Sequence, residues 1–263
     1  MFGIFEKIGG YFTNLLADTG AFVTLFIGMF ASLRRAAPPW REIVRQSYFV
    51  GIESLPVIIT TGAFVGMVIS FQSYNQLLRL GVTSWVGPLV TASLVLQLGP
   101  VLSGVMLAGR VGSAMTAELG TMAVTEQIDA LRTMGVNPLN YLVFPRVLAS
   151  TVLCPLLTSF AILCGTVAGF GLCIYGLGIN GHYMWVQSKA FLHPLDFAEG
   201  LTKAAIFGCA MAVICCQKGI TTRGGAEGVG KSTTASNVQT CIAILLLNLL
   251  VTMVFSQIKN ALL

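Results

Sequence analysis

Five long apolar runs leave this chain few ways to fold. Each contains at most one Lys, Arg, Asp or Glu, and they cover about residues 50–71, 87–107, 147–177, 201–217 and 238–255. A helix needs about 20 mostly apolar residues to cross the hydrocarbon core of a bilayer. Only 10% of the 263 residues are charged, whereas soluble domains average about 25%. We therefore predict an all-α integral membrane protein with about five transmembrane helices.

Some of the runs contain features that disturb a regular helix or bring two helices together. The third run is longer than one span requires, so we expect it to tilt, to extend outward or to break at one of its glycines. Pro100 lies inside the second run, and because proline has no N–H donor we expect a kink there. In the first run, Gly62 and Gly66 form a GxxxG pair, which is a weak indication of close helix packing.

The N-terminal residues 1–45 differ from the rest. Apolar residues at helical spacing over 2–16 predict a helix in the plane of the membrane interface. Residues 11–33 are also apolar but include Asp18, which favours an interfacial or re-entrant element over a span. We interpret residues 1–263 as one domain, with an interfacial elbow region followed by a transmembrane bundle over 50–258.

The basic residues indicate which loops face the cytoplasm. Lys and Arg favour the cytoplasmic side of membrane proteins. They cluster before the first span, around the central loop and in the loop over 218–237: Arg34, Arg35, Arg41, Arg45, Arg110, Arg132, Arg146, Lys218, Arg223 and Lys231. We therefore expect these three segments inside and the C-terminus on the periplasmic side.

The central loop, residues 109–146, carries the strongest functional signal. Its first part has small residues four apart, which on a helix form a smooth strip that another helix can approach closely: Ala108, Gly112, Thr116 and Gly120. Because the loop is polar and lies between two predicted spans, a cytoplasmic partner can reach it.

The second part of this loop, Thr125 to Met134, reads as a short amphipathic helix. Ile128, Leu131 and Met134 share one face, while Glu126, Asp129 and Arg132 occupy another. We expect Thr125 to cap the start, and Gly135 follows the end. Periodicity alone supports two interpretations equally: a helix that docks a protein partner, or an ordinary solvated loop helix.

Residues 225–232 read Gly-Ala-Glu-Gly-Val-Gly-Lys-Ser and match the phosphate-binding pattern G-x-x-x-x-G-K-[ST]. A genuine loop of this kind follows a strand, precedes a helix and lies in an α/β domain. Here the segment lies between two predicted spans, and no acidic residue follows Glu227. We therefore interpret it as a glycine-rich cytoplasmic turn and not as a nucleotide site.

Other reactive side chains give weaker signals. His182, His193, Asp196 and Glu199 share a predicted outer loop, but their spacing fits no metal-ligand pattern, so we expect a solvated loop. Glu53 lies near the end of the first span, where it has a functional role or extends to water. The seven cysteines lie in apolar runs, and we interpret them as small buried residues rather than metal ligands.

Three stretches together resemble one family. They are GAFVGMVISFQSY at 62–74, the block LGPVLSGVMLAGRVGSAMTAELGTMAVTEQIDALRTMGVNPLNYLVFPRVLA at 98–149, and GGAEGVGKSTT at 224–234. This pattern resembles the MlaE (YrbE-type) permease family of bacterial lipid ABC transporters, from about Arg45 onward. In that family the glycine-rich turn does not bind nucleotide.

The resemblance implies a homodimeric permease in the bacterial inner membrane. Such a permease carries phospholipid between that membrane and a periplasmic MCE-domain protein, and it maintains the lipid asymmetry of the outer membrane. A separate cytoplasmic ABC ATPase binds the ATP, and a STAS-type accessory subunit is a further candidate partner. The chain itself would have no catalytic residue, metal or cofactor and would not bind nucleic acid. The rival interpretations are a membrane nucleotidase that uses Gly225–Ser232, and a partner-free channel or scaffold.

The resemblance also assigns candidate sites. The ATPase-coupling residues are Glu118, Gly120, Thr125, Glu126, Ile128, Asp129, Leu131 and Met134. The lipid-cavity residues are Phe64, Met67, Ile69, Phe71 and Gln97. Our hypothesis is that ATP-driven closure of the partner pushes on the 125–134 helix and moves the small-residue strip. One departure is that Leu96 and Gln97 stand where the family often has an Arg-Glu pair, which puts any role of those charges in doubt.

Overall fold

A computed structural model describes residues 20, 22, 24, 27, 28 and 40–262, with side chains described as far as Lys259. The predicted interfacial helix over 2–16 lies outside these residues, and so does almost all of the apolar element over 11–33. Within the described residues the chain is helical and has no strand. This confirms the predicted all-α fold.

The helices lie in long segments in which short irregular turns join consecutive α-helices. The α-helices are α2 (Trp40–Gly51), α3 (Leu55–Arg79), α4 (Val86–Ser93), α5 (Gly99–Leu107), α6 (Ser113–Val124), α7 (Gln127–Thr133), α8 (Phe144–Gly171), α9 (Gly181–Phe191), α10 (Pro194–Ile220) and α11 (Gly225–Leu262). The joining turns are the 3-10 turns η1 (Ile52–Ser54) and η2 (Thr83–Trp85), and the π-helical turns η3 (Leu94–Leu98), η4 (Ala108–Gly112), η5 (Leu139–Val143) and η6 (Leu172–Gly176).

Five helical segments are long and apolar enough to cross a membrane, in the order that the sequence predicts. They are Trp40–Arg79, Thr83–Val124, Leu139–Gly176, Pro194–Ile220 and Gly225–Lys259. All are longer than the apolar runs, because each helix continues beyond its apolar part. The third does not break at a glycine: α8 is continuous, and η6 extends it outward.

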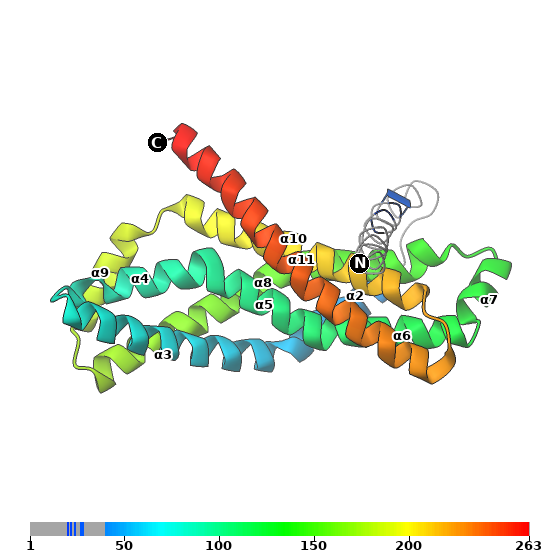
Figure 1. Cartoon of the computed structure of the whole chain (residues 1–263), viewed down its shortest axis with the longest axis horizontal. Coiled ribbons are helices and arrows are strands. Elements are labelled where there is room, and N and C mark those ends of the chain that lie inside the picture. The colour runs from blue at the N-terminus through cyan, green and yellow to red at the C-terminus, as the bar shows by residue number, and fades with distance from the viewer. Residues whose placement is uncertain (1–19, 21, 23, 25–26, 29–39, 263) are drawn as a thin grey trace, which may run out of the picture.

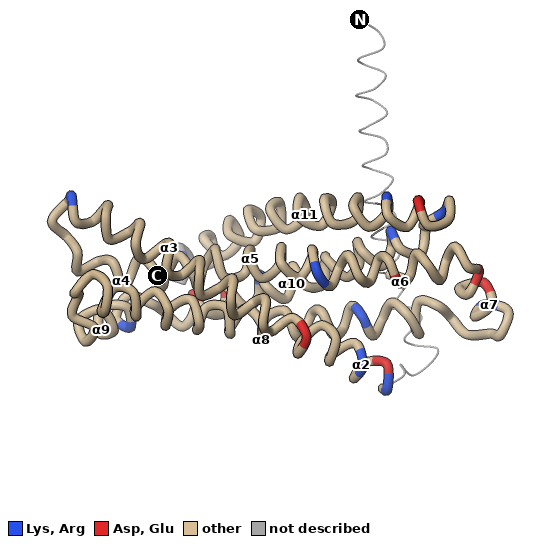
Figure 2. Tube along the Cα trace, turned by 90° about the horizontal axis from the view of Figure 1, so that it is seen from below, with Lys and Arg blue, Asp and Glu red and all other residues tan. Residues whose placement is uncertain are grey.

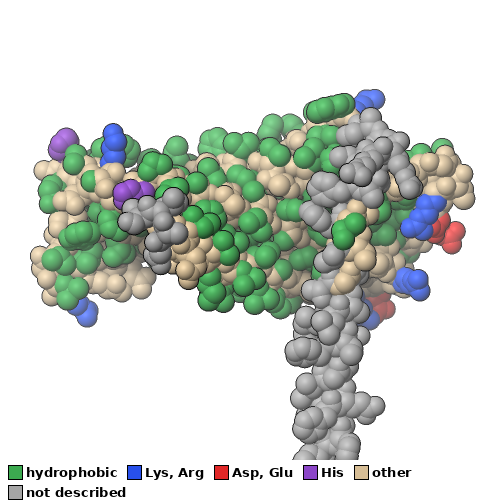
Figure 3. Space-filling model, turned by 90° about the horizontal axis from the view of Figure 1, so that it is seen from above, with side chains coloured by type: hydrophobic (Ala, Val, Ile, Leu, Met, Phe, Trp, Pro, Cys, Tyr) green, Lys and Arg blue, Asp and Glu red, His purple; other side chains and the backbone are tan. Residues whose placement is uncertain are grey.

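These segments run along the long axis of an elongated molecule (Figure 1). The helix α7 lies at one end with the start of α11, whereas α9 lies at the opposite end. We call these the α7 end and the α9 end. Charged residues gather at the α7 end and are sparse in the middle (Figure 2), where apolar side chains cover the surface (Figure 3). A bundle that crosses a bilayer requires this distribution.

Pro100 disturbs its helix through a π-helical turn. The turn η3 ends at Leu98, two residues before the proline, and the N–H of Gly99 donates to the carbonyl of Leu94. Because Pro100 has no N–H, the carbonyl of Leu96, four residues earlier, loses its helical partner. That carbonyl accepts instead from the Nζ of Lys203 at 2.9 Å. A side chain from α10 therefore satisfies the backbone group that the proline leaves open.

The helices α3 and α8 pack along glycines. A Cβ at Gly62 would lie 2.8 Å from the carbonyl oxygen of Ala161, and one at Gly66 would collide with the backbone of Gly165. A Cβ at Gly169 would lie 2.9 Å from the carbonyl oxygen of Gly66. Small residues of this kind let two membrane helices approach backbone to backbone. The prediction from Gly62 and Gly66 is confirmed, and Gly165 and Gly169 of α8 serve packing.

Candidate functional site

The predicted coupling segment lies at a corner between α6 and α7. At this corner Glu126 has φ 60°, a left-handed conformation that is uncommon for residues with a side chain. The prediction that Thr125 caps α7 is wrong, because its hydroxyl donates to the carbonyl of Thr121 in α6 at 2.8 Å. Thr125 therefore ends α6, and Glu126 is the N-cap residue of α7. The corner presents α7 at the extreme end of the molecule (Figure 1).

One face of α7 is anchored in the protein. Ile128 is buried, and Leu131 packs against the same cluster, which includes Leu119 of α6 and Phe144 of α8. A helix of seven residues is not stable alone, so these apolar contacts hold it in place. Met134, which we placed on the apolar face, is instead 76% exposed just beyond the last turn. That part of the prediction is wrong because α7 ends at Thr133.

The opposite face of α7 combines charge with an exposed apolar side chain. Glu126 and Asp129 are exposed, and Asp129 forms an ion pair with Arg132 at 2.8 Å. Both partners are more than half exposed, and such pairs add little stability. Met134 adds a flexible apolar side chain of the kind common in protein interfaces. The anchored helix thus exposes charged side chains and one apolar side chain, a combination that suits contact with a protein.

Glu118, by contrast, is tied into the protein. Its carboxylate accepts from Arg146 of α8 at 2.8 Å, and the same guanidinium donates to the carbonyl of Leu142 at 2.7 Å. Arg146 is only 3% exposed, and a buried charge of this kind requires a partner. Glu118 therefore connects α6 to α8, while 45% of its side chain surface stays exposed.

The small-residue strip packs where α6 meets α10 and α11. A Cβ at Gly112 would lie 2.8 Å from the Sγ of Cys215. The Thr116 hydroxyl lies 3.2 Å from the carbonyl oxygen of Cys215 and 2.9 Å from the hydroxyl of Ser236. Gly120 is buried beside the segment that joins α10 to α11. The predicted close helix approach is confirmed, and the strip links the coupling segment to both C-terminal helices.

Arg110 makes a second connection that the sequence did not reveal. It lies in the π-helical turn η4 and donates to the Ser54 hydroxyl at 2.6 Å and to the Glu53 carboxylate at 3.1 Å. Its guanidinium also lies 5.9 Å from the centre of the Phe49 ring. Glu53 is thus paired with an arginine, and the α5–α6 helix contacts the turn between α2 and α3. No local pattern predicts this contact, because the partners are 56 and 57 residues apart.

Three of the candidate lipid-cavity residues lie on one face of α3. Phe64 and Phe71 are exposed, and Met67 is half-buried between them. Towards the α9 end this face lines an open groove of about 680 Å³, whose residues are Met67, Val68, Phe71, Gln72, Asn75, Gln76, Arg79 and Leu172. The groove is mostly apolar, with amides and one arginine at one end. Its chemistry suits an acyl chain with a polar head.

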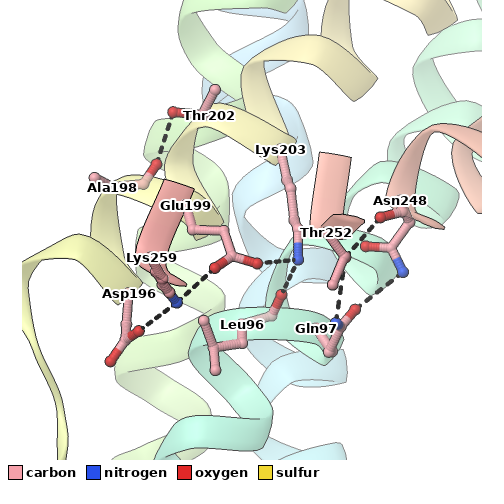
Figure 4. A network of polar contacts seen from close by, with 10 residues as sticks. All are labelled: Leu96, Gln97, Asp196, Ala198, Glu199, Thr202, Lys203, Asn248, Thr252 and Lys259. Carbon is pink, nitrogen blue, oxygen red and sulfur yellow. Dashed lines mark hydrogen bonds and ion pairs between the residues drawn. The ribbon is translucent and has the colours of Figure 1, made fainter. Parts of the chain in front are cut away.

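The other two candidates lie elsewhere in this chain. Ile69 points to the opposite side of α3 and packs against the cluster that contains Val90 and Phe170. Gln97 lies in η3 and contacts α11: its Oε1 accepts from the Asn248 amide at 3.0 Å, and its Nε2 lies 3.5 Å from the Thr252 hydroxyl (Figure 4). The structure of one chain therefore groups Phe64, Met67 and Phe71 but separates Ile69 and Gln97 from them.

Beside Gln97 lies a buried charge network that joins α10 to η3 and α11 (Figure 4). Lys203 is fully buried, and its Nζ lies 2.7 Å from Glu199. Glu199 and Asp196 both contact Lys259 of α11, each at 2.7 Å. Two carboxylates thus face two ammonium groups, so the cluster is balanced in charge.

Two expectations about loops are wrong. Asp196 and Glu199 do not lie in a solvated loop, since α9 and α10 occupy this region and both carboxylates are paired. Among the described residues no group of three His, Cys, Asp or Glu is placed to hold a metal ion. The expected glycine-rich turn over 225–232 is also wrong, because these residues form the first turns of α11.

This helical start lacks the geometry of a phosphate-binding loop. Such a loop directs a series of backbone N–H groups at the phosphates, whereas here the N–H of Gly228 already donates to the carbonyl of Gly224. Lys231 forms an exposed ion pair with Glu227, one turn earlier, at 2.7 Å. The segment thus behaves as the solvated start of a long helix.

Fold and site together define a class of protein: a multi-pass α-helical membrane protein with an anchored, exposed helix at one end. The sequence matches the family described as permease MlaE over residues 43–254, and the chain therefore belongs to the MlaE permease family. This confirms the resemblance seen in the sequence.

Named relatives agree with this membership. The chain is 37% identical over 258 residues to a probable ABC transporter permease protein of Rickettsia conorii, which covers 98% of this chain and 100% of the relative. It is 39% identical over 208 residues to a probable ABC transporter permease protein of Synechocystis, covering 79% of each. It is also 37% identical over 220 residues to the chloroplastic protein TRIGALACTOSYLDIACYLGLYCEROL 1 of Arabidopsis thaliana, covering 83% of this chain and 62% of the relative. The chain is thus similar to subunits of transporters.

Proposed function

We propose that this protein is the permease subunit of an ABC transporter that moves phospholipid between the bacterial inner membrane and a periplasmic MCE-domain carrier, and so maintains outer-membrane lipid asymmetry. The observation that carries the proposal is α7, whose Ile128 and Leu131 are anchored while Glu126, Asp129 and Met134 face outward. A cytoplasmic ABC ATPase docks on this surface and supplies ATP hydrolysis. In this account the permease needs no cofactor of its own.

Force from the ATPase has two routes into the bundle. Through α6 it reaches the small-residue strip, which packs on α10 and α11 at Gly112 and Thr116. Through η4 it reaches Arg110, which contacts the start of α3 and hence the helix that carries the groove. Movement of α11 relative to α3 and α8 then changes the apolar surface that holds lipid.

The groove and the family support a proposal for the substrate and the assembly. The mostly apolar groove beside Phe71, with Arg79 at one end, supports a lipid with an anionic headgroup. The name of the Arabidopsis relative includes the name of a diacylglycerol lipid, and this also favours a lipid substrate. We further propose a homodimer, a periplasmic C-terminus, and a STAS-type protein as an accessory partner.

Purification of the tagged full-length chain in mild detergent tests the proposal. Mass spectrometry of the eluate should find a separate ABC ATPase and an MCE-domain protein, together with bound phospholipid. If the chain is isolated alone and hydrolyses ATP, it is a nucleotidase, and the Lys231→Ala variant will then lose ATP binding. A chain that is isolated alone, is inert and holds no lipid would instead favour a channel or scaffold.

A further inference from the structure

The helix α11 is attached to the rest of the chain differently from the other spans. In its most apolar stretch only 6% of the residues are buried, compared with 67% in α10. Leu245, Leu249 and Met253, for example, are all more than half exposed. Apolar surface does not drive helices together in lipid, because lipid tails are as apolar as leucine. The polar contacts of α11 therefore supplement the packing of Ile244, which is completely buried.

The strongest of these contacts lie at the far end of α11 from α7 (Figure 4). The Nζ of Lys259 lies 2.7 Å from carboxylate oxygens of both Asp196 and Glu199 in α10. Asp196 is held ready for this contact, because its other oxygen accepts the backbone N–H of His193 at 2.9 Å at the start of α10. Hydrogen bonds between charged groups are roughly twice as strong as neutral ones.

The carboxylates keep other partners when Lys259 leaves. Glu199 still contacts Lys203 at 2.7 Å, and Lys203 still donates to the carbonyl of Leu96. The Lys203 side chain is completely buried, whereas that of Lys259 is 24% exposed and close to water. The cluster therefore has a permanent part, formed by α10 and η3, and a detachable part, which is Lys259.

We propose that Lys259, Asp196 and Glu199 form a clasp that closes the α9 end of the bundle, and that α11 swings away from α10 when the clasp opens, so that a lipid can pass between them. The inference rests on the proposed transport function and specifies how its outlet is controlled. Opening frees the Lys259 ammonium and leaves Glu199 paired with Lys203 and Asp196 hydrogen-bonded to the N–H of His193. The contact between Thr116 and Ser236 stays closed and acts as the pivot.

Distances between spin labels on the two helices test the clasp directly. Leu195 and Ile258 are exposed and lie next to the clasp residues in α10 and α11. Cysteines at these two positions carry the labels in full-length protein in lipid nanodiscs, with the half-buried Cys164, Cys209 and Cys241 replaced by alanine. The parent protein should give one short distance between the labels, and Lys259→Met should add a population with a longer distance.

The matched control is Lys231→Met. Lys231 lies in the same helix and forms an ion pair of the same length, 2.7 Å, but at the opposite end and fully in solvent. This variant should leave the distance distribution unchanged. An unchanged distribution in Lys259→Met, or an equal broadening in both variants, would overturn the clasp.

A reversible cross-link tests whether opening is needed for transport. The Asp196→Cys/Lys259→Cys variant is joined by a reducible bis-methanethiosulfonate reagent. ATP-driven transfer of labelled phospholipid to an acceptor is then measured from proteoliposomes that hold the variant with its ATPase. Transfer should be lost on cross-linking and restored by reduction. Unchanged transfer by the cross-linked protein would contradict the clasp as a gate. If the parent protein with its ATPase transfers no lipid when ATP is supplied, the proposed transport function fails, while the spin-label distances still decide whether the clasp exists.

Discussion

Two helix pairs in this molecule are held together by opposite means. The pair α3 and α8 meets backbone to backbone along Gly62, Gly66 and Gly165, where no side chain can be added without collision. The pair α10 and α11 instead meets through side chains, which are apolar where Ile244 shares a cluster with Phe207 and polar at Cys215 with Thr240 and at Lys259 with Glu199. In the first pair the two backbones touch, and in the second the side chains make the contacts.

This difference indicates which part of the bundle is able to move. Close glycine packing depends on one relative position of two helices and is lost if either helix shifts. A polar contact can open and be replaced by water or by a headgroup with little net cost. We therefore infer that α3 and α8 form the fixed part of the bundle and that α11 is the movable part.

The largest effect should come from adding a side chain to the fixed pair. Gly66→Leu would drive the new side chain into the backbone of Gly165 and force α3 from α8. We expect loss of most of the monodisperse protein in detergent, measured by size-exclusion chromatography. Gly171→Leu is the matched control, because a Cβ at that glycine of α8 meets nothing within 4 Å. Equal yields of monodisperse protein from the two variants would show that close glycine packing does not distinguish α3 and α8 from the pair α10 and α11.

The next largest effect should come from Lys203. In Lys203→Met the volume is kept, but two carboxylates then face one ammonium group and the carbonyl of Leu96 loses its donor. Breaking a buried ion pair costs about 3–5 kcal/mol, so the melting temperature in detergent should fall clearly. Adding Glu199→Gln to this variant should recover part of the loss. If the single variant melts like the parent protein, the network does not hold α10 in place.

A smaller effect is expected at Gln97. Gln97→Leu removes the acceptor of the Asn248 amide, a contact of 3.0 Å between η3 and α11. Side-chain hydrogen bonds between membrane helices average about 0.6 kcal/mol, so the melting temperature should fall only slightly. The double variant Gln97→Leu/Asn248→Leu should recover it, because no polar group is then left without a partner. A fall in melting temperature as large as that of Lys203→Met would mean that Gln97 and Lys203 contribute equally to stability.

The smallest effect is expected at the solvent-exposed start of α11, away from the contacts of both helix pairs. Lys231→Met breaks an ion pair with Glu227 in which both side chains are more than three-quarters exposed. Pairs of this kind contribute almost nothing to the free energy of unfolding. Thermal stability and ATP binding should therefore both match those of the parent protein. A marked fall in stability would show that the start of α11 is held more firmly than its exposure indicates.

Much of the fold could be predicted because membrane spans follow from local composition. The five apolar runs predict the spans in the correct order, and the spacing of Gly112 and Thr116 predicts the packed strip of small residues. The amphipathic helix was also foreseen, although Met134 was assigned to the wrong face. At that position the pattern continues after the helix has ended, so periodicity alone misplaces the last residue.

The charged network could not be predicted, because its partners are far apart in sequence. Lys259 is 60 residues from Glu199 and 63 from Asp196, and no local pattern connects them. The start of α11 was missed for a different reason. Its glycines have low helix propensity, which favours a turn, but the helix continues into a span that stabilises it. One of them, Gly228, is needed because any side chain there would collide with the carbonyl of Arg223.

The central claim is that α7 docks a separate ATPase, and co-purification with charge-reversed variants tests it most directly. Glu126→Lys/Asp129→Lys changes only exposed side chains, so the variant should fold and elute like the parent protein. We expect the ATPase to be absent from its eluate but present with the parent protein and with Glu227→Lys, which reverses an exposed charge at the start of α11. Normal recovery of the ATPase with the double variant would contradict the account.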